Sequence, residues 1–381
     1  MIKIKKTKNH KEKPRTDELG FGKYFSDHMF VMDYDKNKGW YNPKIVPFDN
    51  LLVNPSLSTL HYGQSVFEGM KAYLNNHNEV VLFRPKENAK RFKKSCIRMA
   101  MPTIEEDVFV EAVSKLVAID KDWIPKDEGT SLYIRPFMYA TDEVLGVRTS
   151  NTYKFIIILS PVGHYYSNGL KPISIRIDNK YSRTFFGGTG DVKCSANYAI
   201  SLLAQKEASE KGYDQVLWLG GKEHNILSEV GAMNIFFVIE DKIYTPKLDG
   251  TVLPGITRDS VIQLLKMWGH TVLEEDLTVL TLIDKLKYNR VNEIFGTGTA
   301  ATISPIGLIE YAGIEYEISR DIGEISQRLY DSLNRIRTIK GEQYQDWIQV
   351  VQPLESEYLW KKRYCYLRHT CNAGVLCELA L

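Results

Sequence analysis

The sequence predicts a two-domain α+β protein, and three observations lead to this fold class. First, 381 residues with 44% hydrophobic content are enough to bury a sizeable core in each of two domains. Second, apolar residues alternate with a period of two in some runs and recur at helical spacing in others, so strands and helices are both expected. Third, Pro161 to Lys171, with two glycines and Pro172 after it, is the best candidate for a linker.

The linker divides the chain near residue 170. We expect a small N-terminal domain over residues 26–168 and a larger domain over residues 169–352. The basic start, residues 1–25, is interpreted as a mobile arm, because it lacks the apolar segment of a signal peptide and the Arg/Ser-rich, acid-poor character of a transit peptide. Residues 353–381 form a tail of unpredicted conformation.

Composition excludes several classes of protein. The net charge is +2, from 49 basic and 47 acidic residues, so no global field favours nucleic acid or a membrane surface. No apolar run reaches about 18 residues, the length that a membrane-spanning helix needs. Five cysteines cannot all pair, which favours a reducing, cytoplasmic setting. The six-residue spacing of Cys365, Cys371 and Cys377 does not match a zinc site, so no metal is expected.

In the first domain, strands and two helices follow from pattern. Pro85 opens a helix that runs to about Met99, since proline is tolerated in a first helical turn. A second helix is expected over 105–118, with Phe109, Ala112, Val113 and Leu116 in the core. Strands are expected over 30–41, turning at 35–39, and over 80–83, 132–139 and 153–159.

The second domain continues with further strands and helices. A helix over 197–211 has Ile200, Leu203, Ala204 and Ala208 on one face and ends at Gly212. Helices are also expected over 259–267, facing inward with Val261, Leu264 and Leu265, and over 322–336. Strands are expected over 173–177, 215–219, 225–230, 233–239 and 292–295.

The stretch from Phe185 to Tyr198 carries the clearest chemical signal. Gly187, Gly188 and Gly190 permit backbone conformations that a Cβ forbids, and Lys193 follows them on an irregular segment before a helix. A lysine held there can be desolvated and lose its proton, as a Schiff-base lysine must, whereas a lysine on a solvated helix face stays protonated. Since Gly-Gly-x-Gly is common in turns, this stretch alone would not establish catalysis.

Three further segments accompany Lys193: Tyr198 five residues later, Ser-Glu-Val-Gly-Ala-Met-Asn from Ser228, and Phe-Gly-Thr-Gly-Thr-Ala-Ala-Thr-Ile-Ser-Pro from Phe295. In this order and at these distances, the chain from about Phe21 to about Val351 resembles the branched-chain aminotransferases, which are pyridoxal-phosphate enzymes of fold type IV. The resemblance implies two domains, each a mixed, barrel-like sheet with flanking helices. It also implies a homodimer with a shared active site.

The resemblance assigns the cofactor site. Lys193 would bind pyridoxal 5'-phosphate covalently and act as general acid and base, while Tyr198 would bind the ring's phenolic oxygen. Glu229 would keep the ring nitrogen protonated, since a carboxylate in an apolar context needs a specific partner. The phosphate would be bound by a set of groups that suit an anion, namely one guanidinium, one helix N-terminus and one glycine-rich turn: Arg91, Ile256 and Thr257, and Gly298 and Thr299.

The resemblance also assigns the substrate pocket. Its walls would be Tyr62 and Phe67, with Tyr133 and Arg135 facing the substrate and Arg135 accepting the distal carboxylate of glutamate. Thr299 and Ala300 would complete it, with Tyr165 as a lid residue and Leu145 and Val147 reaching the neighbouring subunit's pocket. At Ala232 the chain departs from many relatives, which often carry a hydroxyl residue there, so the minor contact that such a hydroxyl would make is not expected.

The expected activity is transamination of leucine, isoleucine and valine with 2-oxoglutarate. Two alternatives remain open at this point. Another fold-type-IV enzyme, such as a D-amino-acid aminotransferase or an aminodeoxychorismate lyase, would share the lysine and glutamate but not the block Tyr62 to Phe67 or Arg135. A catalytically silent module that only binds the cofactor is the alternative from a different class. Ala301 and Ser304 stand where some relatives carry two cysteines, which excludes a redox switch there.

Overall fold

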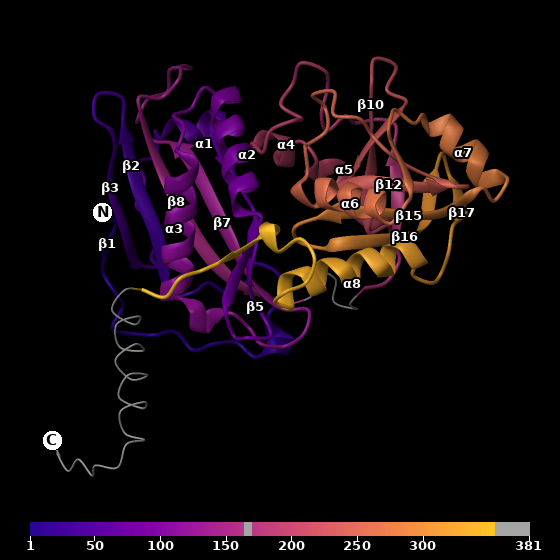
Figure 1. Ribbon diagram of the computed structural model, residues 1–381. Coiled ribbons are helices and arrows are strands. Elements are labelled where there is room, and N and C mark those ends of the chain that lie inside the picture. Colours follow the sequence, from indigo (N-terminus) through magenta and orange to yellow (C-terminus); the bar gives the residue numbers. More distant parts are fainter. Residues whose placement is uncertain (164–169, 355–381) are drawn as a thin grey trace, which may run out of the picture.

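The computed structural model describes residues 1–163 and 170–354. Two nine-stranded sheets organise this part of the chain, the first built from strands before residue 163 together with β18 near residue 350, and the second from strands after residue 172. In Figure 1 they form two bodies lying side by side, with the first in indigo to magenta and the second in orange tones. Within the described residues, no helix combines the length and apolar character needed to cross a membrane.

The first sheet has the order β1-β3-β2-β8-β7-β5-β6-β18, with β4 paired to β7. It is antiparallel except for the pairing of β1 with β3. Its long central strands β7 and β8 pair over ten residues, from Ser131–Val162 to Ala140–Tyr153. The strands are β1 (Lys3–Ile4), β2 (His28–Asp35), β3 (Gly39–Pro47), β4 (Ser65–Phe67), β5 (Met70–Leu74), β6 (Val80–Phe83), β7 (Ser131–Ala140), β8 (Thr152–Val162) and β18 (Ile348–Val350).

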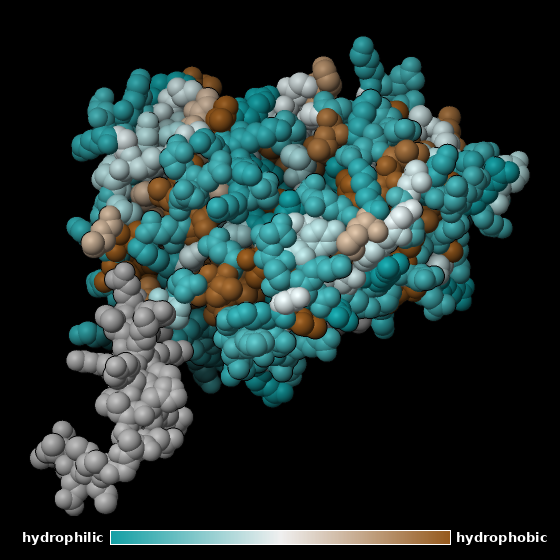
Figure 2. Space-filling view, in the orientation of Figure 1, coloured by the Kyte–Doolittle hydropathy of each residue, from teal (hydrophilic) through white to brown (hydrophobic). Residues whose placement is uncertain are grey.

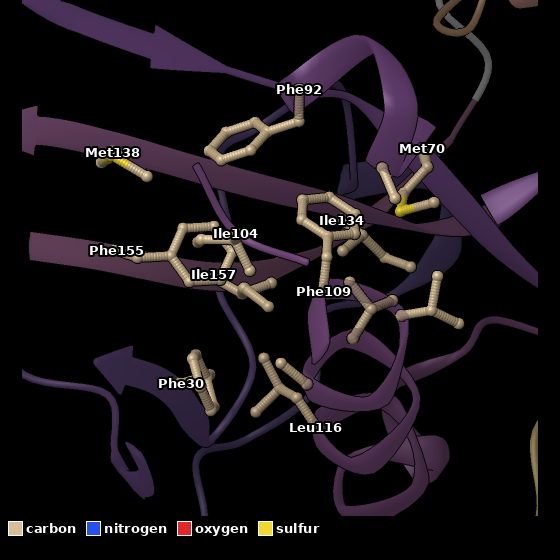
Figure 3. Packing of buried hydrophobic residues seen from close by; sticks show 14 of the residues in the cluster. Phe30, Met70, Phe92, Ile104, Phe109, Leu116, Ile134, Met138, Phe155 and Ile157 are labelled. Atoms are coloured by element: carbon tan, nitrogen blue, oxygen red, sulfur yellow. The ribbon is translucent and has the colours of Figure 1, made fainter. Parts of the chain in front are cut away.

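Helices α2 (Pro85–Arg98) and α3 (Glu106–Ile119) cover one face of this sheet, and α1 (Ser58–Tyr62) lies in the connection before β4. Phe109, Val113 and Leu116 are buried on α3 at helical spacing, as predicted. Figure 3 shows this face of α3 packed against Phe30, Phe92 and Phe155 in the core. The core is therefore built from two helices and one face of the sheet.

The second sheet has the order β11-β10-β9-β16-β15-β12-β13-β14, and β17 pairs with β16. An additional pairing of β11 with β12 closes six of these strands into a barrel. Residues on β12 are buried along its whole length, which is typical of a strand covered on both faces. The strands are β9 (Ile173–Asp178), β10 (Gln215–Gly220), β11 (Ile226–Val230), β12 (Met233–Ile239), β13 (Lys242–Thr245), β14 (Thr271–Glu274), β15 (Val291–Gly298), β16 (Thr302–Tyr311) and β17 (Ile314–Glu317).

In the described part of this domain, five helices surround the barrel: α4 (Ala196–Ala199), α5 (Leu202–Glu210), α6 (Ile256–Met267), α7 (Val279–Lys287) and α8 (Glu324–Thr338). The inward residues predicted on α6, Val261, Leu264 and Leu265, are buried. The helix predicted over 197–211 is divided into α4 and α5, and its predicted core face is wrong in part. Ala204 and Ala208 are buried, but Ile200 and Leu203 are 50% and 52% exposed.

The end of the described chain returns to the first domain. After α8 and a short 3-10 helix (Gln345–Trp347), β18 pairs antiparallel with β6. Trp347 lies edge-on to Phe83, with 5.7 Å between ring centroids. Residues 348–350, which we predicted within the second domain, therefore extend the sheet of the first, as the yellow segment in Figure 1 shows.

The start of the chain, predicted to be a mobile arm, is instead bound to the first domain. Strand β1 pairs with β3, and the Thr7 N–H donates to His28 Nε2 at 2.9 Å. Asp27 accepts from the Lys11 N–H at 2.9 Å and pairs with His10 at 2.7 Å. Two further 3-10 helices lie in this domain, Thr16–Glu18 and Lys121–Trp123.

Candidate active site

A cavity of about 170 Å³ lies between the two domains, and it gathers most of the residues predicted from the motifs. Those residues come from six separate elements and from the glycine-rich segment, so they meet only through the fold. The lining consists of Phe21, Phe67, Gly69, Arg91, Tyr133, Arg135, Lys193, Tyr198, Gln215, Glu229, Ala232, Met233, Asn234, Leu253, Gly255, Ile256, Thr257, Thr297, Gly298, Thr299 and Ala300.

The segment that carries Lys193 is irregular, as predicted, and is fixed to the first domain on both sides. The Lys193 N–H donates to Ser95 Oγ at 3.0 Å, and its carbonyl accepts from the Phe67 N–H at 3.0 Å. Ser65 Oγ donates to Ser195 Oγ at 2.6 Å. Because these bonds hold the backbone, the lysine side chain enters the cavity from a defined position rather than from a mobile loop.

The Lys193 amine lies among aromatic groups. Its Nζ donates to Tyr198 Oη at 2.8 Å and lies 5.1 Å from the centroid of the Phe67 ring. Phe67 and Tyr198 also contact each other, with 4.8 Å between ring centroids. No carboxylate is bonded to this amine within residues 1–163 and 170–354. The arrangement suits an amine that must exchange a proton with a bound ligand.

Glu229 lines the cavity and is 2% exposed. Its Oε2 accepts a hydrogen bond from Arg183 Nη1 at 2.5 Å, and the Arg183 side chain is equally buried. Asn234 Nδ2 approaches Oε1 at 3.4 Å. Burial raises the pKa of Glu229, while the Arg183 charge opposes that shift. The carboxylate therefore has a cation on one side and the cavity on the other.

Arg91, on α2, lines the end of the cavity formed by the start of α6 and is held by Glu68, which is fully buried. Arg91 Nε and Nη2 donate to the two Glu68 oxygens at 2.7 and 2.9 Å. Burial would raise the pKa of Glu68, but Arg91 lowers it overall, so the pair is ionised. Arg91 Nη1 donates to the Pro254 carbonyl at 3.2 Å, which brings the guanidinium beside the start of α6.

Backbone donors converge at the same end. Helix α6 begins at Ile256 and Thr257, where a helix offers free N–H groups and a partial positive charge. A Cβ at Gly255 would overlap the Asn234 side chain, so this close approach requires glycine. The hairpin between β15 and β16 contributes Gly298 and Thr299 to the lining. The end thus combines a guanidinium, a helix N-terminus and a glycine-containing turn, which together suit a phosphate group.

The residues predicted for the substrate are brought together only in part. Phe67, Tyr133, Arg135 and Ala300 line the cavity. Arg135 Nη2 donates to Tyr133 Oη at 2.9 Å, and the guanidinium stacks 4.6 Å from the Phe67 ring centroid. Within the described part of the chain Arg135 Nε is buried without a hydrogen-bond partner. An arginine with unfilled donors beside apolar walls can accept a ligand's carboxylate.

Three predicted substrate residues lie outside this cavity. Tyr62, expected in its wall, is instead 45% exposed and donates to the Leu145 carbonyl. Leu145 and Val147 are 63% and 82% exposed, so they do not contact the chain's own cavity, consistent with the expectation that they reach a neighbouring subunit. Tyr165 lies outside the described residues.

Sequence reasoning missed three residues of this site. Glu68 stands in the block that was singled out, and a carboxylate between Phe67 and Gly69 could have signalled a buried ion pair. Arg183 precedes Lys193 by ten residues and carries no local signal of its contact with Glu229. Phe21 was assigned to a mobile arm, yet it lines the cavity and contacts Tyr133 edge-on at 4.9 Å.

Comparison with known proteins defines the class. The model of the family "Amino-transferase class IV" matches residues 65–309. This range begins at β4, ends in β16 and includes Lys193, Glu229 and Arg91. The chain belongs to the class IV aminotransferases.

Individual relatives define the family within this class. The chain is 50% identical over 337 residues to "Branched-chain-amino-acid aminotransferase 2" of Bacillus subtilis (strain 168), covering 88% of this chain and 93% of that protein. It is 48% identical over 352 residues to a "Probable branched-chain-amino-acid aminotransferase" of Staphylococcus aureus (strain N315), covering 92% and 98%. It is therefore a member of the branched-chain-amino-acid aminotransferase family.

Solved structures agree on the fold. The branched-chain aminotransferase of Thermoproteus uzoniensis, crystallised with norvaline, matches with a TM-score of 0.71 at 26% identity, covering 85% of this chain and all of that one. The branched-chain amino acid aminotransferase of Thermobaculum terrenum, in its PLP form, matches with a TM-score of 0.69 at 24% identity, covering 86% and 98%. The predicted two-domain fold of type IV is confirmed.

Proposed function

We propose that the protein transfers the amino group of L-leucine, L-isoleucine or L-valine to 2-oxoglutarate, giving branched-chain 2-oxo acids and L-glutamate. The observation that carries this proposal is the meeting of Lys193, Tyr198, Glu229 and Arg91 in one cavity. A relative 50% identical over most of its length bears the name of this activity.

The cofactor that we assign to the cavity is pyridoxal 5'-phosphate, and the residues present fit it. Arg91 and the start of α6 suit the phosphate, and the buried Glu229 suits a protonated ring nitrogen. Thr297 Oγ1 lines the cavity and, among the described residues, is buried without a hydrogen-bond partner, as a group awaiting a ligand would be.

When bound, pyridoxal phosphate supplies a carbonyl that an amine can capture and a ring that accepts electrons released at the Cα atom of an amino acid. Lys193 Nζ is the group of this chain that would hold this carbonyl and would move the proton at Cα. Tyr198 Oη bonds to that Nζ and fixes its direction. The ion pair with Arg183 favours the negative charge of Glu229 although burial raises its pKa, and this charge would oppose loss of a proton from a ring nitrogen.

The pocket beside Lys193 fits two kinds of substrate side chain. Phe67, Phe21 and Tyr133 offer apolar and aromatic surface for an aliphatic group. Arg135 offers guanidinium donors for the second carboxylate of glutamate and 2-oxoglutarate. Alternate use of these two features explains how one site can accept both partners of the reaction.

We further propose that the protein is a homodimer with a shared active site. The face in Figure 2 is mostly hydrophilic, with apolar residues in separated patches. In contrast, large apolar side chains are exposed on two segments close to the cavity, which monomers seldom tolerate. The first segment, tied together by pairing of Leu57 with Glu143, includes Leu52, Leu60, Leu145 and Val147, and the second includes Phe185, Phe186, Ile200, Leu202 and Leu203.

We place the protein in the cytoplasm. Cys96 and Cys194 are buried and unpaired, and burial raises the pKa of the Cys96 thiol, so this thiol is unreactive. Such thiols suit a reducing compartment. Cell fractionation with activity assays of each fraction tests the location, and activity confined to a membrane or extracellular fraction contradicts it.

The activity is tested by the absorbance of the purified holo-protein. Addition of L-leucine should convert the cofactor to its amino form and shift its band, and 2-oxoglutarate should reverse the shift. A band that shifts with D-alanine but not with leucine would favour a D-amino-acid aminotransferase. A band that no amino acid shifts would favour a binding module without catalysis.

The assignment of Lys193 is tested by borohydride reduction followed by peptide mass spectrometry. The reduced cofactor should be attached to Lys193, and Lys193→Ala should abolish both attachment and transamination. Lys94→Ala is the matched control, since Lys94 is about half-exposed and pairs with Asp191 outside the cavity lining. Attachment to another lysine of the unmodified chain would end the assignment.

A further inference from the structure

Two cations are buried behind the phosphate end of the cavity. Lys71, on β5, is 9% exposed, and its Nζ donates to the Ala300 carbonyl at 2.8 Å. Arg337, on α8, is 3% exposed, and its Nη1 donates to Thr302 Oγ1 at 2.9 Å. One residue comes from each domain, and both contacts fall on the turn between β15 and β16.

Lys71 and Arg337 differ from the buried arginines of the cavity in having no partner of opposite charge among the described residues. Arg91 is balanced by Glu68 and Arg183 by Glu229, whereas neither Lys71 nor Arg337 has a carboxylate partner within residues 1–163 and 170–354. Among the described residues Arg337 Nε has no hydrogen-bond partner, and the guanidinium faces the rings of Tyr73 and Phe83. Uncompensated buried charge is costly, so the pair indicates an anion that is present in the working protein.

The neighbouring groups identify where that anion lies. A small cavity of about 20 Å³ borders Lys71 and Arg337 and also Ile256, Thr257 and Thr299. It is large enough for about one water molecule and too small for a phosphate group. A larger cavity of about 430 Å³ also borders Lys71, but Arg337 does not line it, whereas the small cavity borders both cations and the start of α6. This shared border favours the donors at the start of α6 as the place of the anion.

The turn has a strained backbone, and hydrogen bonds from the two cations stabilise it. Thr302 has a φ of 66°, a left-handed conformation that is rare for a β-branched residue and usually falls to glycine in hairpins. Arg337 binds the Thr302 hydroxyl, and Lys71 binds the carbonyl two residues earlier. Thr299 at the start of the turn lines the main cavity, so its position depends on these two bonds.

We propose that Lys71 and Arg337 are positioning residues for the phosphate group of the cofactor: they hold the turn at residues 299–302 and supply positive charge behind the phosphate site. The proposal rests on the proposed function, because it takes a phosphate monoester dianion as the ligand. Burial and the nearby Arg337 charge lower the pKa of Lys71 to about 7, as expected for a cation that lacks its counter-ion.

The charge is tested with Lys71→Gln, whose amide can still donate to the Ala300 carbonyl, and with Arg337→Gln. Dissociation constants are measured by titrating each apo-protein with pyridoxal 5'-phosphate and with pyridoxal, which lacks the phosphate. We expect at least a tenfold weaker affinity for pyridoxal phosphate and less than a twofold change for pyridoxal. Lys90→Gln, which removes a half-exposed charge one residue from Arg91, is the matched control and should change neither.

Thermal unfolding separates this role from simple bracing. Removing an uncompensated charge should leave the melting temperature of the apo-protein unchanged or raise it. The melting temperature of the pyridoxal-phosphate form should fall. The increase in melting temperature that pyridoxal phosphate causes should therefore become smaller. Lower melting temperatures in both forms, or equal losses for pyridoxal and pyridoxal phosphate, would overturn the proposal. Failure of the unmodified protein to bind pyridoxal phosphate at Lys193 would instead reject the proposed function.

Discussion

At the scale of single residues, two ion pairs of the same kind border the cavity. Each joins a buried carboxylate to a guanidinium, Glu68 with Arg91 and Glu229 with Arg183. In one pair the arginine lines the cavity, and in the other the carboxylate lines it. Arg91 and Glu229 are therefore each held by a buried partner of opposite charge.

Arg135→Ala should weaken the reaction with glutamate far more than the reaction with leucine, because only glutamate brings a second carboxylate. Loss of a charge-assisted hydrogen bond costs about 1.5–3 kcal/mol, or roughly ten- to a hundredfold in rate. The two half-reactions are measured separately by stopped-flow absorbance. The leucine half-reaction is the internal control, and equal losses in both would show that Arg135 only supports Tyr133 and Phe67.

Glu229→Gln should lower kcat by about a hundredfold or more, since it removes a charge that stabilises the transition state. It also leaves Arg183 buried without its ion-pair partner, so the apo-protein should lose stability by about 3–5 kcal/mol. The double variant Glu229→Gln/Arg183→Met should recover much of that stability without recovering turnover. If the double variant regains both, or Glu229→Gln turns over normally, Glu229 is structural only.

At the scale of elements, periodicity was a good guide where one face of an element meets the core of the same subunit. Helices α2 and α3 and strands β7 and β8 all lie within two or three residues of their predicted bounds. The helix predicted over 197–211 differed, since Ile200, at the end of α4, and Leu203, on α5, follow the predicted helical period but are about half-exposed. An apolar stripe shows only that a surface is to be covered, not which chain covers it.

Other elements carry no local signal that could have revealed them. Strands β13, β14 and β17 have four residues each, too few for a period to be recognised. Strand β18 exists because β6 offers an unpaired edge and Trp347 packs on Phe83. These are contacts between distant parts of the chain, which a single sequence does not report.

Two C-terminal truncations, one after residue 354 and one after Tyr344, should differ in stability. A protein that ends at residue 354 keeps β18 and should retain its melting temperature and activity. A protein that ends at Tyr344 loses β18 and Trp347 and exposes the edge of β6, so its melting temperature should fall by several degrees or more. Calorimetry of both proteins is the measurement. Loss of activity in the longer one would mean that residues beyond 354 contribute to the site.

At the scale of the whole molecule, association and activity should be lost together. Leu145→Asp and Val147→Asp introduce charge into an exposed apolar segment that we assign to a subunit interface. Light scattering after gel filtration should report monomers, and transamination should fall at least tenfold. Ile314→Asp is the matched control, since Ile314 is 56% exposed on β17. Dimers that persist in both variants would contradict the shared site.

The site could be predicted from sequence to the extent that it is contained in motifs. Lys193, Tyr198, Glu229 and Arg91 lie in stretches whose residue types and order are recognisable, and all four line one cavity. Tyr62, the last residue of α1, lies outside the cavity of its own chain and beside Leu145, a position that no local pattern indicates. Glu68, Arg183 and Phe21 support those residues from positions that only the assembled fold brings near.

Strand β18 has a consequence for how this molecule is made. The first sheet is missing its last strand until residue 350 has been synthesised, although its other strands are complete by residue 162. At about 5–20 residues per second, β6 therefore emerges from the ribosome roughly ten seconds or more before the strand that covers it. Throughout that interval the growing polypeptide carries a free strand edge, on which another nascent chain or a chaperone can act.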